Sequence, residues 1–440
     1  MALNVEIHQK ENVRPFSPTP HSLRNYKLSQ IDQIEGTHYT SMLFFYNTGG
    51  AAHHHDYDAL KQSLSKTLSV FYPVAGRVKD GMTIECNDEG VDFVTANVTN
   101  YDLSDFVRVC KVDDLRQLLP FDPYPMEFDP SQPMLGVQVN KFRCGGTAVA
   151  ICVWHGVADA AAIGGFVQTW SAINRGEGGG GGGGDDLVVD ATAIFPPALN
   201  FDFSAPTSAA ARLIKTSGGK YSKKRFVFRK EEIERMRDEY TLPDRRRPTS
   251  VEALSAFIWA AVIRANQNAK MHILIHVTDL RKRLNPPFPS MCLGNFVYVT
   301  GARWMADGAG GVTPQSLVGN IREAIIKVTG EYVRKIETQG GLTTEIEKIA
   351  AFGVDEIKVF GISSICGFPF HELDFGWGKP IWFVLVPFNL MDGANFYKTG
   401  DGGIEAMIGL TPQVMSSLDK DKEFLARVSC IQTMSSLLST

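Results

Sequence analysis

One histidine stands where an apolar strand pattern ends and a helical pattern begins. His155 follows the apolar run at residues 147–154, and Asp159 opens the helical pattern behind it. A histidine held at the end of a sheet can project into a cleft and take a proton from a hydroxyl group as a general base. Small residues follow it, among them Gly156 and Ala158, and they leave room for a substrate. The alternative is a core histidine, with Asp159 as an ordinary helix N-cap.

A second cluster lies near the C-terminal end, where residues 374–378 read Asp-Phe-Gly-Trp-Gly. Two glycines around a tryptophan favour a tight bend that buries an aromatic side chain. Asp374 could serve in such a bend to hold the backbone amides of the turn. A turn of this kind needs no catalytic role.

Three consecutive histidines occupy residues 53–55. In a helix or a strand, ligands of one ion stand four or two positions apart, so consecutive histidines cannot all face one metal. We therefore predict a solvated loop here and no metal site in the chain. The seven cysteines lack CxxC spacing, which is typical of free thiols in a reducing compartment.

The length and charge of the chain exclude several classes of protein. Its 440 residues exceed the roughly 250–300 that one hydrophobic core supports, so two domains are expected. Lys and Arg total 44 against 48 for Asp and Glu, which gives no reason to expect a nucleic-acid partner. The apolar stretch at 381–391 falls short of the roughly 20 residues of a membrane span. The polar N-terminus lacks a signal-peptide core, so we expect a cytoplasmic protein without a membrane partner.

Seven consecutive glycines at residues 178–184 divide the sequence. A phosphate-binding loop would need a preceding strand and a following Lys-Ser/Thr pair, but a helical pattern precedes this run and acidic residues follow it. We interpret residues 178–220 as a flexible linker. The expected domains are then residues 1–177, with His155 and Asp159, and residues 221–440, with the cluster at Asp374.

Helical and strand patterns alternate on both sides of this linker. The spacing of apolar residues predicts helices at residues 60–71, 161–173, 253–264 and 317–334. Short apolar runs predict strands at 137–141, 147–154, 225–228, 273–277, 296–299, 381–386 and 404–410. The fold class is therefore α/β, with two mixed halves of similar size.

In this order and at this separation, the His155-xxx-Asp159 and Asp374-Phe-Gly-Trp-Gly378 motifs resemble those of the plant BAHD acyltransferases. The resemblance extends over nearly the whole chain. The later segments are most similar to the branch that holds vinorine synthase and other alcohol acetyltransferases. Further segments that carry it are residues 26–32, 72–77, 251–259, 279–281, 294–296 and 362–364. The chain departs from the family pattern at Ala160, usually Gly, and at His371, often an aromatic residue. Residues 291–295 also lack the pattern associated with malonyl transfer, which favours an uncharged acyl donor.

The resemblance implies two similar domains of the chloramphenicol acetyltransferase type, with a solvent channel between them. His155 would stand in that channel as the general base, with acyl-CoA entering from one side and the alcohol from the other. Asp159 would pair with Arg281 and orient the histidine loop. Asp374 is often described as catalytic in the family, but a role in shaping the CoA channel suits a turn better. The remaining expected contacts are with CoA or the acyl group, at Ser255, Gly294, Asn295, Phe296, Ser364 and Trp377.

The expected function is transfer of an acetyl group from acetyl-CoA to a hydroxyl group of a plant alkaloid, terpenoid or other alcohol. Acyl-CoA would be a co-substrate, and no permanently bound cofactor is expected. The alternatives are transfer of a hydroxycinnamoyl, benzoyl or branched acyl group, or a small-molecule-binding member of the family without catalysis. A monomer is expected, with the acyl donor and the alcohol as its partners.

Overall fold

The computed structural model describes residues 2–36, 38–47, 56–125, 127–177, 187–199, 201–203, 221–244, 246–306, 311–338, 356–386 and 392–434. The glycine run at 178–184 and the histidines at 53–55 lie outside these ranges. The chain forms two compact units. Unit 1 comprises Met1–Thr207, Phe288–Phe296 and Phe368–Val386, and unit 2 comprises Ser208–Pro287, Val297–Gly367 and Pro387–Thr440.

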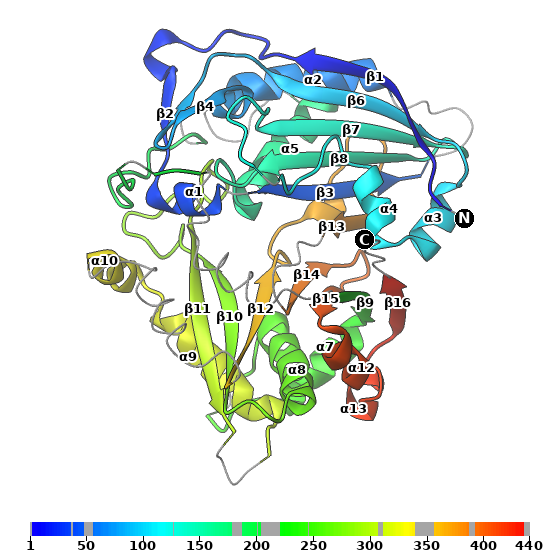
Figure 1. Ribbon diagram of the computed structural model, residues 1–440, viewed down its shortest axis with the longest axis vertical. Helices are drawn as coiled ribbons and strands as arrows, with labels where there is room; N and C mark the ends of the chain where they lie inside the picture. The colour runs from blue at the N-terminus through cyan, green and yellow to red at the C-terminus, as the bar shows by residue number, and fades with distance from the viewer. Residues whose placement is uncertain are drawn as a thin grey trace. The chain divides into compact units, whose positions relative to one another are not determined.

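This division differs from a single cut at the linker. Two segments of the second half of the sequence, 288–296 and 368–386, belong to unit 1. The second of them carries Asp374, which the sequence pattern assigns to the C-terminal domain. The physical reason is strand pairing, because β13 (Trp382–Leu385) forms an antiparallel ladder with β3 (Tyr39–Tyr46) in the sheet of unit 1 (Figure 1).

Unit 1 is built on a six-stranded mixed sheet with the strand order β1-β6-β7-β8-β3-β13. Its pairs are antiparallel except β6 and β7, which run parallel. The remaining strands are β1 (Val5–Val13), β6 (Val91–Val98), β7 (Leu135–Phe142) and β8 (Thr147–Trp154). Every residue of β8 is buried, as its continuous apolar sequence predicts for a central strand.

Helices α2 (Tyr57–Val70) and α5 (Ala160–Asn174) lie side by side behind this sheet (Figure 1). The indole of Trp170 on α5 donates to the carbonyl of Leu60 on α2, at 3.1 Å. A small sheet, β2-β5-β4, lies beside α1 (Gln30–Glu35), whose Gln33 amide donates to the carbonyl of Gly81 between β4 and β5. Helices α3 (Leu103–Val109) and α4 (Val112–Gln117) also belong to this unit. The small-sheet strands are β2 (Asn25–Lys27), β4 (Arg77–Asp80) and β5 (Thr83–Glu85).

Unit 2 is built on a seven-stranded mixed sheet with the strand order β11-β10-β12-β14-β15-β9-β16. Its strands are β9 (Ser222–Phe228), β10 (Met271–Asp279), β11 (Val297–Met305), β12 (Ile357–Ser364), β14 (Gly393–Lys398), β15 (Ile404–Leu410) and β16 (Cys430–Met434). Its helices include α7 (Lys230–Glu239), α8 (Ser250–Ala265), α9 (Pro314–Lys327), α10 (Gly330–Thr338), α12 (Pro412–Leu418) and α13 (Lys422–Leu425).

Helix α8 forms the centre of the core of unit 2. Its residues from Glu252 to Ile263 are all buried, and Phe257 stacks on Phe424 of α13 with 5.5 Å between ring centroids. Thr249 caps the helix in the expected capping box with Glu252. The expected single helix at 317–334 is instead two helices, α9 and α10. The break occurs because the Thr329 hydroxyl accepts from the Tyr332 N–H and starts a new helix.

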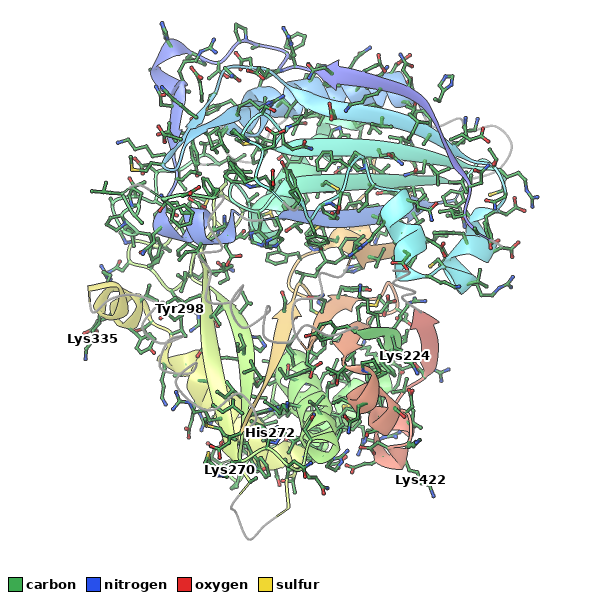
Figure 2. The ribbon with its side chains drawn as sticks, viewed as in Figure 1. Lys224, Lys270, His272, Tyr298, Lys335 and Lys422 are labelled. Carbon is green, nitrogen blue, oxygen red and sulfur yellow. The ribbon has the colours of Figure 1, made fainter. Side chains whose placement is uncertain are left out.

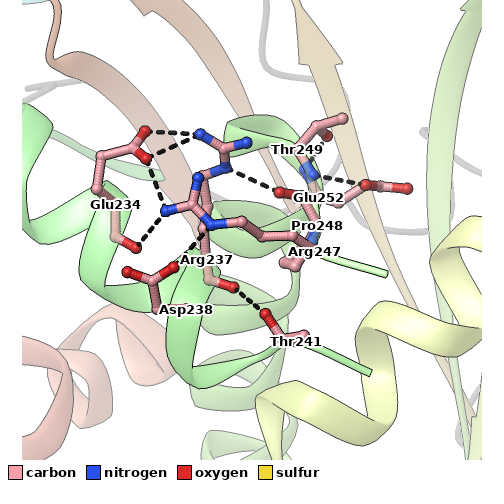
Figure 3. A network of polar contacts seen from close by, with 8 residues as sticks. All are labelled: Glu234, Arg237, Asp238, Thr241, Arg247, Pro248, Thr249 and Glu252. Atoms are coloured by element: carbon pink, nitrogen blue, oxygen red, sulfur yellow. Dashed lines mark hydrogen bonds and ion pairs between the residues drawn. The ribbon is translucent and has the colours of Figure 1, made fainter. Parts of the chain in front are cut away.

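An ion-pair network fixes α7 to the start of α8 (Figure 3). Arg247, three residues before α8, bonds to Asp238 and Glu234 of α7 at 2.7 and 2.8 Å. Arg237 of α7 reaches Glu234 and, through its Nε, the carbonyl of Pro248 at 2.8 Å. These side chains are partly exposed, so each pair contributes little alone and the network acts mainly by fixing geometry.

Two buried histidines on one face of β10 should make unit 2 sensitive to acid. His272, labelled in Figure 2, is 1% exposed, and burial followed by the nearby Lys358 charge lowers its pKa to about 4. Burial also lowers the pKa of His276. Both pKa values lie below that of an unfolded histidine, about 6.5, so the unfolded chain takes up protons first as the pH falls. The stability of unit 2 should therefore decrease as the pH falls from about 6.5 to about 4.

The change His272→Gln tests this prediction, because glutamine does not titrate. We expect the melting temperature of this variant to fall less between pH 6.5 and pH 4.5 than that of the wild type. His21→Gln, at an exposed position in unit 1, is the matched control and should follow the wild type. Equal slopes for His272→Gln and the wild type would contradict the assignment.

Candidate active site

His155 lies directly after β8, at the turn that leads into α5, as its sequence position predicts. Its backbone N–H donates to the carbonyl of His38 at 2.9 Å. Its side chain is 19% exposed, so the imidazole is held by the protein and is still reachable. The Nδ1 atom is buried, and no hydrogen-bond partner for it occurs among the described residues. The Oε2 atom of Glu35 lies 3.8 Å from this Nδ1.

The carboxylate of Asp159 accepts hydrogen bonds from backbone N–H groups around the histidine loop. Its Oδ1 accepts from the N–H of Ala162 at 3.0 Å and caps α5, and its Oδ2 accepts from the N–H of Phe296, also at 3.0 Å. The residue is 2% exposed. Both oxygens thus hold main-chain groups, which agrees with an orienting role and not with proton transfer.

The segment 288–296 packs directly on the histidine loop. Ala158 and Gly294 form a parallel bridge, in which the Gly294 N–H donates to the Val157 carbonyl at 3.0 Å. The Asn295 amide donates to the carbonyl of His155 at 2.7 Å. Gly294 has a φ of +105°, which favours glycine, and a Cβ there would lie 3.2 Å from the Tyr26 hydroxyl. These contacts give a structural role beside the base to three residues that were expected as CoA contacts, Gly294, Asn295 and Phe296.

Asp32 joins this segment to the N-terminal part of the chain. Its Oδ1 accepts from the backbone N–H and the side-chain amide of Asn295, at 2.8 and 2.9 Å. Its Oδ2 accepts from the N–H and hydroxyl of Ser29, at 2.8 and 2.7 Å. Complete burial raises the pKa of Asp32, and these hydrogen bonds partly offset the rise. The motif at 26–32 includes Asp32, but sequence reasoning gave it no role, although its spacing from Ser29 fits a capping box.

His38 is a second imidazole beside the candidate base. Its ring centroid lies 5.0 Å from that of His155, with the rings tilted by 47°. Burial, followed by the charge on His155, lowers the pKa of His38 to about 3. His38 is therefore neutral near pH 7 and does not repel the proton that His155 would accept. Sequence reasoning did not identify this residue.

The Asp374 cluster forms a tight turn, as its glycines indicate. The Oδ1 of Asp374 accepts from the N–H groups of Gly376 and Gly378, at 2.7 and 2.8 Å. Both glycines have positive φ, at +92° and +85°. Trp377 packs edge-on against Tyr46 with 5.5 Å between ring centroids. The carboxylate thus stabilises a turn whose aromatic side chain anchors to β3.

The change Asp374→Asn should leave most of the activity, because asparagine keeps an acceptor oxygen for the turn. Asp374→Ala leaves the two amides without that acceptor and should cost about 1 kcal/mol of unfolding free energy. Urea unfolding and kcat would be measured for both variants. The control is Asp401→Ala, which removes the acceptor of the Gly403 N–H in a turn of unit 2. A kcat for Asp374→Asn reduced more than about 100-fold at unchanged stability would give Asp374 a direct part in proton transfer.

Three expected site residues belong to unit 2. Ser255 on α8 is fully buried, and its hydroxyl has no hydrogen-bond partner among the described residues. Arg281 is also fully buried, and its guanidinium lies 3.3 Å from Asp279. Ser364 ends β12, and its hydroxyl accepts from the Cys366 N–H at 3.4 Å. The roles expected for them, including the pairing of Arg281 with Asp159, stay predictions.

The described part of the chain contains no group of three or more His, Cys, Asp or Glu side chains placed to hold a metal ion. Among the helices of the same ranges, none is long and apolar enough to cross a membrane.

Comparison with characterised proteins gives matches along almost the entire sequence. The chain is 35% identical over 437 residues to limonoid 21-O-acetyltransferase of Melia azedarach, with 97% of this chain and 99% of that protein covered. It is 32% identical over 442 residues to stemmadenine O-acetyltransferase of Catharanthus roseus, with 96% and 97% covered.

Solved structures share the fold. The crystal structure of vinorine synthase superimposes with a TM-score of 0.80 at 28% identity, covering 97% of this chain and 98% of that one. TRI101 of F. sporotrichioides, complexed with coenzyme A and T-2, gives a TM-score of 0.75 at 18% identity, covering 93% and 100%. The expectation of the chloramphenicol acetyltransferase type of fold, with two mixed sheets, is thereby confirmed.

A model of the Transferase family matches residues 3–425, which include His155, Asp159 and the Asp374 turn. The family match, the relatives above 30% identity and the shared fold agree with the motifs on which the resemblance was based. The chain therefore belongs to the Transferase family, that of the BAHD acyltransferases.

Proposed function

We propose that this protein transfers an acetyl group from acetyl-CoA to a hydroxyl group of a plant specialised metabolite, with His155 as the general base. The observation that carries the proposal is the setting of His155, a partly exposed imidazole held at a strand end by backbone bonds to His38 and Asn295. The names of the relatives support the type of reaction, since both are O-acetyltransferases. Coenzyme A bound to TRI101 supports an acyl-CoA donor, because this fold can hold that molecule.

The chemistry requires one proton acceptor beside the attacking oxygen. The neutral imidazole of His155 takes the hydroxyl proton while the oxygen attacks the thioester carbonyl, because the alcohol becomes acidic only as the new bond forms. The C–S bond then breaks, and CoA leaves as a thiolate, whose conjugate thiol has a pKa of about 8.5. The imidazolium returns its proton to the thiolate or to water. Such a leaving group makes a covalent acyl-enzyme unnecessary.

The remaining residues would prepare the base and the donor. Asp159 fixes the loop through Ala162 and Phe296, and we propose Arg281 as its charged partner. Ser255, Ser364 and Trp377 stay candidates for contacts with CoA or the acyl group. The turn at Asp374 would shape the path of CoA without moving protons.

The names of two relatives of similar identity indicate different acceptor skeletons, since one is named for a limonoid and the other for stemmadenine. We propose an alkaloid or terpenoid alcohol as the acceptor. We also propose that the enzyme works as a monomer in the cytoplasm, which size-exclusion chromatography and a fluorescent fusion would check.

The test is release of CoA thiol from acetyl-CoA in the presence of a panel of limonoid and alkaloid alcohols, with mass spectrometry of the product. We expect an acetyl ester of at least one alcohol and loss of the reaction in His155→Ala. Benzoyl-CoA, coumaroyl-CoA and malonyl-CoA are run in competition. If transfer from one of these donors is faster, its acyl group replaces acetyl in the proposed reaction. CoA binding without transfer to any alcohol would favour a non-catalytic binding protein.

A further inference from the structure

The end of helix α1 lies against the candidate base. Glu35 is the last residue of α1, and its Oε2 is 3.8 Å from the Nδ1 of His155. This Nδ1 is buried and, within the described residues, has no hydrogen-bond partner. A buried ring nitrogen without a partner is unusual, because such groups are normally satisfied. The carboxylate beside it is therefore a candidate partner.

The position of Glu35 is fixed from both sides. One turn earlier in α1, Asp32 holds Asn295, which in turn donates to the carbonyl of His155. On the other side, the carbonyl of Gly36 accepts from the indole of Trp154 at 3.0 Å. A Cβ at Gly36 would lie 2.9 Å from the Trp154 ring, so the helix end packs closely on the strand that ends just before His155. The chain on either side of Glu35 is thus hydrogen-bonded to Trp154 and Asn295, the two residues that adjoin His155.

The side chain of Glu35 keeps some freedom within this frame. It is 28% exposed, and a separation of 3.8 Å exceeds a hydrogen bond by less than one ångström. A small side-chain rotation would bring the carboxylate into bonding distance of Nδ1. The adjacent His38 is held neutral by its burial, with a pKa of about 3, so it adds no positive charge beside His155.

We propose that Glu35 is a positioning residue for His155, an inference that rests on the acyl transfer proposed above. Its carboxylate accepts the Nδ1–H, which leaves the lone pair on Nε2 to take the hydroxyl proton. When that proton arrives, both nitrogens carry hydrogen, and the carboxylate stabilises the positive ring. Glu35 exchanges no proton in this step, so the atoms of the reaction balance as before. Asp159 is directed elsewhere, because its two oxygens accept from the amides of Ala162 and Phe296.

A different role for the same carboxylate would be recognition of a cationic acceptor, such as a protonated alkaloid amine. The two roles differ in the kinetic constant that they affect. Loss of a positioning group for the base lowers kcat, whereas loss of a countercharge for the acceptor raises KM for that acceptor.

The test uses Glu35→Gln and Glu35→Leu in the full chain, assayed with acetyl-CoA and the best alcohol of the panel. Glutamine keeps an acceptor for Nδ1–H but lacks the charge, and leucine lacks both. We expect kcat to fall about tenfold for glutamine, roughly 1.4 kcal/mol of transition-state stabilisation, and further for leucine, with both KM values within about twofold of wild type. Glu85→Gln, the same change at an exposed position of β5 in the same unit, is the control and should leave kcat unchanged.

The combination with His155→Ala separates a positioning role from a general structural one. If Glu35 acts through the imidazole, Glu35→Gln should cause no further loss in the His155→Ala background. An equal loss in both backgrounds, an unchanged kcat, or an effect confined to KM of the acceptor would overturn the inference. The proposed function fails in a different way, when the wild type forms no ester or when His155→Ala is as active as the wild type.

Discussion

Replacing His155 with alanine is expected to lower kcat by about 10²–10⁴-fold while the protein stays folded. The imidazole is the proton acceptor of the proposed reaction, and its neighbour His38 cannot replace it, because burial holds the pKa of His38 at about 3. The backbone bonds of residue 155, from its N–H to His38 and from the Asn295 amide to its carbonyl, do not involve the side chain. The loop should therefore keep its shape in the variant.

Steady-state kinetics with acetyl-CoA and a limonoid alcohol, together with a melting curve, would measure this effect. The control is His21→Ala, at an exposed site of unit 1, and should retain full activity. A His155→Ala variant that keeps more than about a tenth of the wild-type kcat would show that another group takes the proton. A collapsed melting curve would instead point to a structural histidine.

The elements around His155 could be predicted because local sequence determines them. The apolar run of β8 and the helical spacing of α5 occur at the expected residues, and Asp159 caps the helix between them. Thr249 and Glu252 likewise form the capping box that their spacing predicts. In each case the interacting groups lie within a few positions, so their spacing in the sequence indicates the contact.

The pairing of distant segments could not be predicted in this way. The strand expected at 381–386 occurs, but it joins the sheet of unit 1 through β3, more than 300 positions earlier in the chain. Its apolar sequence fits a core strand of either sheet, so periodicity could not choose between them. For the same reason the turn at Asp374 was expected in the C-terminal domain, although Tyr46 of β3 donates to the carbonyl of Leu373 at 3.0 Å.

The surroundings of the base show the same limit. His155 was found because its motif is contiguous, whereas Glu35, His38 and Asp32 approach it from a segment more than 100 positions earlier. Glu35 carries no local pattern that separates it from a surface acid at the end of a helix. Its relevance comes from the packing of α1 on Trp154 and Asn295, which the fold creates.

Replacing Asp32 with alanine is expected to cause the largest loss of stability among these changes. The carboxylate accepts four hydrogen bonds, from the N–H and side chain of Ser29 and from the same two groups of Asn295. Burial raises its pKa, so the ionised group is itself costly at neutral pH, and alanine removes that cost. Alanine also leaves buried donors without an acceptor, at about 1–3 kcal/mol for each donor that water cannot reach. The second effect is larger, and we expect a net loss of about 2–4 kcal/mol.

The same change should reduce activity. The Asn295 side-chain amide donates to Asp32 and to the His155 carbonyl, and without Asp32 it is held less firmly against the histidine loop. Asp32→Asn should be intermediate, since asparagine offers one acceptor oxygen and turns an NH₂ group toward the other pair of donors. Urea unfolding and kcat would be measured side by side for both variants. Asp105→Ala, which removes an exposed acid of α3 paired with Arg108, is the control and should shift unfolding by less than about 0.5 kcal/mol. If Asp32→Ala unfolded at the urea concentration of the wild type, the hydrogen bonds from Asp32 through Asn295 to His155 would not stabilise the fold. These bonds of α1 would then not be what holds Glu35 in place beside His155.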